Sequence, residues 1–159
     1  MKTDTTKMKQ LGDIGEKIVS NYYSSKGCVI EISINPYDNQ KDLKVDGQWV
    51  EVKTQQPHVK LRALTFQPNQ LRKCRNPNTR LTFVTSEASF SPTYKWNNCF
   101  FEVDSDFKYF EYTTKEDVKM IGIPIEQPSV KFIKKVEKRE ADEMKKFAQS
   151  NYKNGRRKY

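Results

Sequence analysis

Apolar residues near the start of the chain recur first with the spacing of a helix and then with that of a strand. The helical set, at three- and four-residue intervals, is Leu11, Ile14, Ile18, Val19 and Tyr22. This spacing predicts a helix over residues 6–26, which Gly27 ends as a C-terminal glycine commonly does. Residues 28–34 then alternate between apolar and polar side chains, which predicts a half-buried strand.

The next alternating segments are expected to form a β-hairpin. Residues 42–45 and 48–53 are joined by an Asp-Gly dipeptide, the strongest short-range hairpin signal. A two-residue turn fixes the pairing so that Asp42 falls opposite Glu51, and Lys53 shares the face of Glu51. The other face of the hairpin is apolar throughout and consists of Leu43, Val45, Val50 and Val52.

The rest of the chain reads as further helices, strands and loops. The expected segments are a loop (55–62), a basic helix with a proline in its first turn (65–75), a buried strand (81–85), two aromatic-rich strands (95–103 and 107–112) and a charged, partly amphipathic helix (130–150). The order α-β-β-β-α-β predicts an α/β fold with a mixed sheet, plus extra C-terminal strands and a basic helix. We expect a single domain over residues 1–150, with its core at about 7–85, and a basic, disordered tail over 151–159.

Charge is distributed unevenly along the chain. The formal net charge is +9, and the sequence pI is about 9.4. Residues 52–86 contain seven Lys or Arg and no Asp or Glu, and residues 131–159 contain eleven Lys or Arg against four Asp or Glu. Such segregation is typical of a surface that binds phosphates, so nucleic acid is the first candidate partner.

Composition also argues against several classes of protein. No apolar run approaches the roughly 20 residues that a membrane span needs, and the N-terminus lacks the apolar region of a secretory signal. Three widely spaced cysteines fit neither a disulfide framework nor a zinc site, so we expect a reduced, cytoplasmic protein. A single histidine excludes the multi-histidine nuclease and zinc-hydrolase designs, and there is no P-loop.

The polar face of the predicted hairpin carries candidate chemistry. Two directly opposed carboxylates repel each other unless a cation lies between them, and carboxylate oxygens suit Mg²⁺. Such an ion could activate water and neutralise a phosphate, while Lys53 could orient or deprotonate that water. Glu16, at the edge of the helical apolar stripe, could complete the site. The alternative is an exposed face whose charges pair for solubility, but the acid-free basic stretch after Lys53 favours a phosphodiester site.

These residues together resemble the PD-(D/E)XK nuclease superfamily. The pattern is Asp42, a short hairpin and Glu51-Val-Lys, preceded by a helix that contains Gly-Glu16. Within the superfamily, the segments 11–17 and 51–54 look most like archaeal Holliday-junction resolvases and small phage or restriction-type nucleases. The resemblance implies a restriction-endonuclease-like core. The chain departs from the pattern at Lys41, where the superfamily often has proline.

The resemblance also implies roles for individual residues. It makes Glu16, Asp42, Glu51 and Lys53 catalytic. The implied metal ligands are Asp42, Glu51, the Val52 carbonyl and Glu16, with Mg²⁺ as the cofactor and Mn²⁺ as a substitute. The expected nucleic-acid-binding residues are Gln55, Lys60, Arg62, Gln67, Gln70, Arg72, Lys73 and Arg75.

The sequence therefore predicts a Mg²⁺-dependent DNA endonuclease that acts on duplex or branched DNA. The alternative is a non-catalytic nucleic-acid-binding or regulatory protein on a nuclease-like scaffold. RNA stays open as a substrate, and so does a homodimer, for which the aromatic-rich middle of the chain could supply an interface. Trp49 also has two readings, as a base-stacking side chain or as cover for the Lys44 stem.

Overall fold

The computed structural model describes residues 2–34 and 41–156, with side chains from 6 to 33 and from 43 to 147. The helices are α1 (Lys2–Ser25), the short 3₁₀ turn η1 (Pro68–Gln70), α2 (Leu71–Cys74) and α3 (Lys138–Arg156). The strands are β1 (Ile30–Ile34), β2 (Lys41–Val45), β3 (Gln48–Gln55), β4 (Ala63–Phe66), β5 (Thr79–Thr85), β6 (Cys99–Val103), β7 (Phe110–Thr113), β8 (Lys119–Pro124) and β9 (Val130–Lys135).

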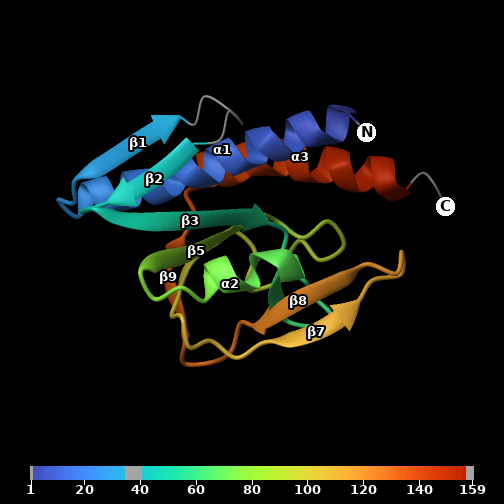
Figure 1. Ribbon diagram of the computed structural model, residues 1–159. Coiled ribbons are helices and arrows are strands. Elements are labelled where there is room, and N and C mark those ends of the chain that lie inside the picture. Colours follow the sequence, from blue (N-terminus) through green and yellow to red (C-terminus); the bar gives the residue numbers. More distant parts are fainter. Residues whose placement is uncertain (1, 35–40, 157–159) are drawn as a thin grey trace.

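The described strands form two sheets (Figure 1). The larger sheet has the order β1-β2-β3-β5-β6-β9, and the smaller sheet has the order β4-β8-β7. Strands β3 and β5 are parallel, and the other neighbours in the larger sheet are antiparallel. The parallel step needs a crossover, which consists of β4, η1 and α2. The fold is therefore mixed α/β, as the sequence predicted.

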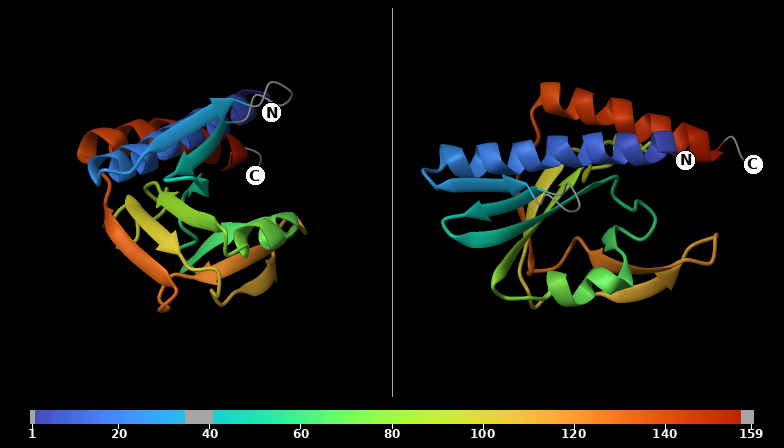
Figure 2. Two further views of the ribbon diagram at one scale, coloured as in Figure 1. Left: turned by 60° about the vertical axis from the view of Figure 1, so that its left-hand side comes forward. Right: turned by 45° about the horizontal axis from the view of Figure 1, so that its top comes forward.

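The larger sheet has a hydrophobic core on each face. Helices α1 and α3 pack side by side on one face (Figure 2). The residues with the least exposure in that core are Ile18, Val19, Val45, Val84, Phe100 and Met144. The smaller sheet and α2 cover the other face, where the core includes Leu64, Phe83, Phe101, Phe107, Ile121 and Ile123. A polar side chain on the face of β3 that points away from α1 and α3 therefore lies between the two sheets or at the edge where they separate.

Helix α1 ends as the sequence predicted. The Gly27 backbone has a φ of +85°, which glycine adopts without strain. The Gly27 N–H donates to the Ser24 carbonyl at 3.0 Å, and the Cys28 N–H donates to the Tyr23 carbonyl at 3.1 Å. These two bonds form a Schellman motif, which satisfies carbonyls at the end of the helix and turns the chain into β1.

The β2–β3 hairpin has the predicted register. Asp46 and Gly47 both have positive φ, 50° and 80°, as a type I′ turn requires. The two strands pair Leu43 with Val50, Lys44 with Trp49, and Val45 with Gln48. The apolar face of the hairpin packs against α1, as expected. Asp42 is the next residue of β2, one position beyond these pairs, and its side chain lies outside the described residues.

Two predicted helices are partly wrong. The segment 65–75 begins as strand β4 and becomes helical only from Pro68, because apolar Ala63–Phe66 pairs with β8. The segment 130–150 begins as strand β9, an edge strand that pairs with β6, and α3 starts only at Lys138. Helix α3 then continues to Arg156, six residues past its expected end. Strand β8 was not predicted. None of the described helices has the length and apolar character needed to cross a lipid bilayer.

Candidate active site

Glu51 lies at the centre of a polar cluster on the face of β3 that is turned toward α2. Its carboxylate is close to two ammonium groups: Oε2 is 3.2 Å from Lys53 Nζ, and Oε1 is 2.9 Å from Lys73 Nζ. The Glu51 side chain is only 18% exposed and that of Lys53 21%, so the pair between these two residues is poorly screened by water. The Thr82 hydroxyl of β5 donates to the Glu51 carbonyl at 2.9 Å, which ties the backbone here to the neighbouring strand.

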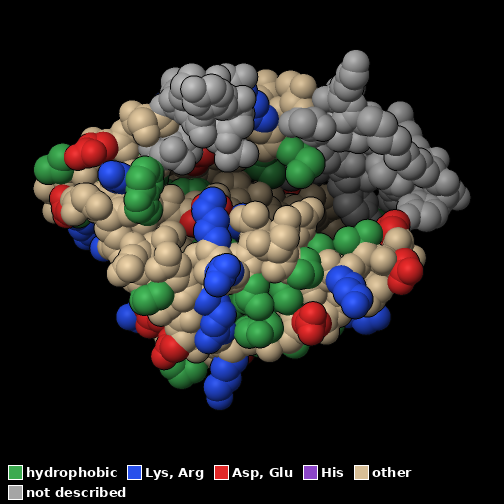
Figure 3. Space-filling model, viewed as in Figure 1, with side chains coloured by type: hydrophobic (Ala, Val, Ile, Leu, Met, Phe, Trp, Pro, Cys, Tyr) green, Lys and Arg blue, Asp and Glu red, His purple; other side chains and the backbone are tan. Residues whose placement is uncertain are grey.

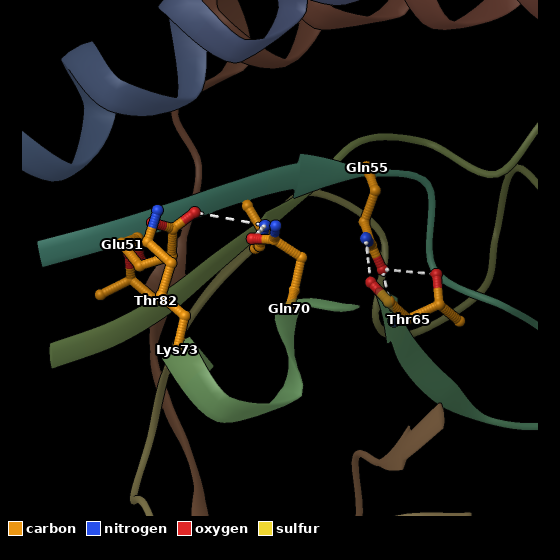
Figure 4. A network of polar contacts seen from close by, with 7 residues as sticks. Glu51, Gln55, Thr65, Gln70, Lys73 and Thr82 are labelled. Atoms are coloured by element: carbon orange, nitrogen blue, oxygen red, sulfur yellow. Dashed lines mark hydrogen bonds and ion pairs between the residues drawn. The ribbon is translucent and has the colours of Figure 1, made fainter. Parts of the chain in front are cut away.

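The two lysines differ in how firmly they are held. Lys53 Nζ also donates to the Gln70 side-chain oxygen at 3.0 Å, and its side chain is 21% exposed. Lys73 comes from the four-residue helix α2 and is 56% exposed. Figure 4 shows the side chains of Glu51, Gln70 and Lys73 converging from β3, η1 and α2. The parallel crossover between β3 and β5 therefore assembles the cluster, because it carries η1 and α2 across the face of β3.

Cys74 anchors the helix that carries Lys73. It is 1% exposed and belongs to the core between the sheets. Burial raises the pKa of the Cys74 thiol to about 11, with smaller effects from the neighbouring charges of Lys53 and Glu51. The thiol is therefore neutral at ordinary pH and acts as a small apolar contact rather than as a nucleophile.

Gln55, two residues beyond Lys53 on the same face, is bound to the backbone of β4. Its Nε2 donates to the Thr65 carbonyl at 2.7 Å, and its Oε1 accepts from the Thr65 N–H at 2.8 Å (Figure 4). Thr65 Oγ1 lies 3.3 Å from the same Oε1. The Gln55 amide thus makes two hydrogen bonds with the Thr65 backbone, as the backbone of a neighbouring strand would. These bonds join the larger sheet to the smaller one. Its expected nucleic-acid contact stays a prediction.

Two arginines predicted to bind nucleic acid have protein partners. Arg62, with a φ of 52°, pairs with Glu126 through its guanidinium, and this pair raises the Arg62 pKa and lowers that of Glu126. Arg75 donates to the Phe107 carbonyl at 2.7 Å and lies 4.8 Å from the Phe107 ring centroid. Both guanidinium groups therefore have structural contacts in addition to any phosphate contact.

The other predicted nucleic-acid-binding residues lie at the surface of the protein. Gln67 precedes η1, Lys60 lies in the loop between β3 and β4, and Arg72 lies on α2; all three are exposed. Figure 3 shows a column of Lys and Arg side chains on this face of the molecule, with acidic groups beside its upper end. Trp49 is 46% exposed, and Lys44 Nζ lies 4.2 Å from its ring centroid, which favours the reading of Trp49 as cover for Lys44.

The three remaining predicted site residues, Glu16, Asp42 and Val52, lie on α1, β2 and β3. Glu16 is half-exposed on α1, directly after Gly15, whose Cα packs against Thr54 of β3. Val52 is half-buried, and its side chain packs on the helix-covered face of the sheet. Asp42 precedes Leu43 on β2, one position beyond the paired residues, so its backbone lies on the same hairpin, and its side chain lies outside the described residues.

Binding of Mg²⁺ here would require further oxygen ligands beside the Glu51 carboxylate. Among the residues with described side chains, no three His, Cys, Asp or Glu groups gather as a metal site, and Asp42 lies outside that set. The Glu51 carboxylate nevertheless already holds two cationic groups within 3.2 Å, so it is placed to bind positive charge. Asp42, the Val52 carbonyl and Glu51 would together offer the oxygen ligands that Mg²⁺ prefers.

Sequence reasoning missed the partners that organise this cluster. It placed Lys73 on a nucleic-acid surface rather than on Glu51, and it assigned nothing to Thr82 or Thr65. These contacts depend on how β4, η1 and α2 cross the sheet, and no local sequence pattern encodes that path. No protein-family model, curated protein or solved structure matches this chain.

Proposed function

We propose that this protein is a metal-dependent nuclease that hydrolyses phosphodiester bonds in DNA, with its active site at Glu51 and Lys53. The observation that carries the proposal is the pairing of a poorly exposed carboxylate with Lys53, two residues further along the same strand face and held by Gln70. This geometry fixes the Lys53 ammonium beside the Glu51 carboxylate.

The strand arrangement supports the same proposal. An antiparallel β1-β2-β3 meander followed by a parallel β5 agrees with the core implied by the resemblance to PD-(D/E)XK nucleases. Leu43 pairs with Val50 in the hairpin, so the preceding Asp42 and the following Glu51 are expected to oppose each other. Both features follow from residues within the first 85 positions, which is the extent of the resemblance.

Each residue of the site would have a distinct part in hydrolysis. Lys53 would hold its ammonium toward the scissile phosphate, where it could orient the attacking water or stabilise developing negative charge. Gln70 would keep that ammonium in place. Glu51, Asp42 and the Val52 carbonyl would hold Mg²⁺, which when bound would activate water and neutralise phosphate charge. Exposed Arg72 would bind phosphates away from the reacting group.

One observation favours the second candidate, a non-catalytic nucleic-acid-binding protein. Both Glu51 oxygens already have an ammonium partner, so the carboxylate needs no metal for charge balance. In that reading the cluster would only hold α2 against β3, and the exposed basic side chains would bind nucleic acid without cleaving it.

A substrate panel separates the two candidates. Purified protein is incubated with labelled linear duplex DNA, single-stranded DNA, four-way-junction DNA and RNA, each with Mg²⁺, Mn²⁺ or EDTA. The proposal predicts cleavage of at least one DNA substrate that EDTA abolishes. Binding without cleavage across the whole panel would instead support the non-catalytic candidate. Cleavage of RNA alone would keep the reaction but replace the substrate.

A further inference from the structure

Edge strand β9 carries an exposed aromatic ring next to a pocket lined by lysines. We propose that this surface binds one unpaired nucleotide of a single-stranded nucleic acid, with its phosphate in the pocket and its base on the Phe132 ring. The proposal goes beyond the nuclease reaction, because binding here needs neither Glu51 nor Lys53. This β9 site consists of Lys95, Trp96, Phe132, Lys135 and Lys138.

The β9 site is separate from the Glu51 cluster, although both lie on the same face of the larger sheet. Lys53 is aligned with Phe83, Phe83 with Phe101, and Phe101 with Phe132, across β3, β5, β6 and β9. Three steps between neighbouring strands place the Phe132 backbone about 14 Å from that of Lys53. The buried rings of Phe83 and Phe101 lie between them. A nucleotide at Phe132 would therefore be a different one from the nucleotide at Lys53.

Three lysines and one carboxylate are the charged groups that line the pocket. Its volume is about 450 Å³, and these four residues are Lys95, Lys135, Lys138 and Asp142. The Lys135 ammonium donates to the carbonyls of Lys95 at 2.7 Å and Asn97 at 2.9 Å, which holds it at the wall of the pocket. Lys95 and Lys138 are exposed, so their ammonium groups can reach an anion there. The excess of positive charge favours a phosphate.

Phe132 supplies the aromatic surface of the site. It is 48% exposed, although its ring centroid lies 6.2 Å from that of Trp96 and 6.1 Å from that of Phe101. Phe101 is 1% exposed, so it supports the Phe132 ring from the core. An exposed ring that is held by neighbouring rings is a preformed surface on which a base can stack.

Lys95 joins the pocket to the aromatic rings. Its ammonium lies 4.6 Å from the Trp96 ring centroid, and the same residue lines the pocket. Trp96 in turn contacts Phe132. The cationic and aromatic parts of the surface are therefore adjacent, as the phosphate and the base of one nucleotide are.

This combination favours an unpaired nucleotide over other occupants. A free phosphate would use the pocket but leave the Phe132 ring exposed, and an apolar protein surface would have to cover the lysines. Bases within a duplex stack on one another, so their faces are not available to a side chain. Little preference among bases is expected, because every base has a face that can stack.

Tryptophan fluorescence tests the β9 site, because the chain has only two tryptophans, Trp49 and Trp96. In a Trp49→Phe parent the emission reports on Trp96 alone. The parent is titrated in EDTA, which prevents metal-dependent cleavage. A short oligothymidylate should quench the emission, and so should an oligouridylate of the same length, whereas a DNA duplex of that length should quench it much less.

Two pairs of variants of this parent test the two parts of the site. Phe132→Leu keeps an apolar side chain but loses the aromatic face, so it should bind the oligothymidylate about tenfold more weakly, while Phe132→Tyr should bind like the parent. Lys95→Gln should reduce the salt slope of binding by about 0.7, the value for one phosphate of a single strand. Lys119→Gln removes a charge from an exposed position on β8 and should leave the slope unchanged. Urea denaturation checks that each variant folds.

The outcomes separate this inference from the proposed nuclease. Equal affinities of Phe132→Leu and Phe132→Tyr, or equal quenching by duplex and single strand, would overturn the β9 site and leave the nuclease proposal as it was. Weaker binding by Phe132→Leu, with no cleavage anywhere in the substrate panel, would support the β9 site and remove the nuclease. A dimer in sedimentation, with Trp96 emission that changes with protein concentration, would overturn the β9 site, because a second copy would then cover the ring.

Discussion

The side-chain amide of Gln55 pairs with the backbone of Thr65, donating to its carbonyl at 2.7 Å and accepting from its N–H at 2.8 Å. This contact joins the last residue of β3 to the middle of β4. It holds the two sheets together at the end of the strand that carries Glu51 and Lys53. The residue therefore has a structural role that is separate from any contact with nucleic acid.

Replacing Gln55 should destabilise the fold. Gln55→Ala leaves the half-buried Thr65 backbone groups without these partners, and we expect the free energy of unfolding to fall by about 1–2 kcal/mol. Urea denaturation measures the change, and Gln67→Ala, at an exposed position, serves as the control. Unchanged stability together with weaker DNA binding would show instead that Gln55 acts mainly on the nucleic acid.

Alanine substitutions at two glycines of α1 should change the free energy of unfolding in opposite directions. A Cβ on Gly15 would lie 1.8 Å from Thr54 Oγ1, whereas a Cβ on Gly12 would meet nothing within 4 Å. Gly15→Ala should therefore lower the free energy of unfolding by about 1–3 kcal/mol. Gly12→Ala should raise it by about 0.5–1 kcal/mol, because alanine favours the helix.

Thermal or urea unfolding of both glycine variants checks this contrast. The double variant Gly15→Ala/Thr54→Ala should recover part of the loss, because it removes the closest atom, although the Thr54 Cβ is also only 2.9 Å from the added carbon. Equal effects of alanine at positions 12 and 15 would contradict the close packing of α1 on β3.

Alkaline pH should weaken the stabilising contribution of Cys74. Its pKa is raised from 9.0 to about 11 in the fold, so the unfolded chain loses the proton first as pH rises. The native state then holds more protons than the unfolded state between about pH 9 and 11, and stability falls with pH across that window. Below pH 9 both states hold the proton, and the contribution is complete.

Cys74→Ala isolates this effect. The difference in the free energy of unfolding between the wild type and Cys74→Ala should shrink by roughly 2 kcal/mol between pH 8 and 10.5, as measured by urea denaturation at each pH. A difference that stays constant or grows would show that the thiol is not buried as described.

The helix and the hairpin near the start of the chain could be predicted because their signals are local. The apolar stripe that contains Leu11 and Ile18 specifies which face of α1 is buried. The Asp46-Gly47 turn specifies the register of β2 and β3, since few other residues tolerate two successive positive φ angles. Glu51 and Lys53 could thus be assigned to one face before any tertiary contact was known.

The crossover could not be predicted in the same way. Ala63–Phe66 is a short apolar run that fits either a helix or a buried strand, and only its pairing with β8 decides for the strand. All six residues of strand β9 are exposed or partly exposed, and three of them are lysines, so the strand resembles a charged helix in sequence. The contact between Lys73 and Glu51 depends on this same crossover, which is why it emerged only from the structure.

Arg72 and Arg75 should differ in their effects on DNA binding and on stability. Arg72 is exposed, so Arg72→Gln should lower the salt slope of DNA binding by about one while leaving stability within about 0.5 kcal/mol. Arg75 donates to the Phe107 carbonyl and stacks on that ring, so Arg75→Gln should lower stability by about 1 kcal/mol. Fluorescence anisotropy across a salt series, with urea denaturation alongside, checks both, and a wild-type slope in Arg72→Gln would remove that residue from the interface.

The most direct test of the proposed active site compares two isosteric substitutions in a Mg²⁺-dependent cleavage assay on the best substrate of the panel. Glu51→Gln removes the charge at the centre of the cluster, and Glu111→Gln removes one from an exposed position on β7. The proposal predicts that Glu51→Gln binds the DNA but does not cleave it, as does Lys53→Ala, while Glu111→Gln cleaves at the wild-type rate. Full cleavage by Glu51→Gln would contradict the assignment of this cluster as the active site.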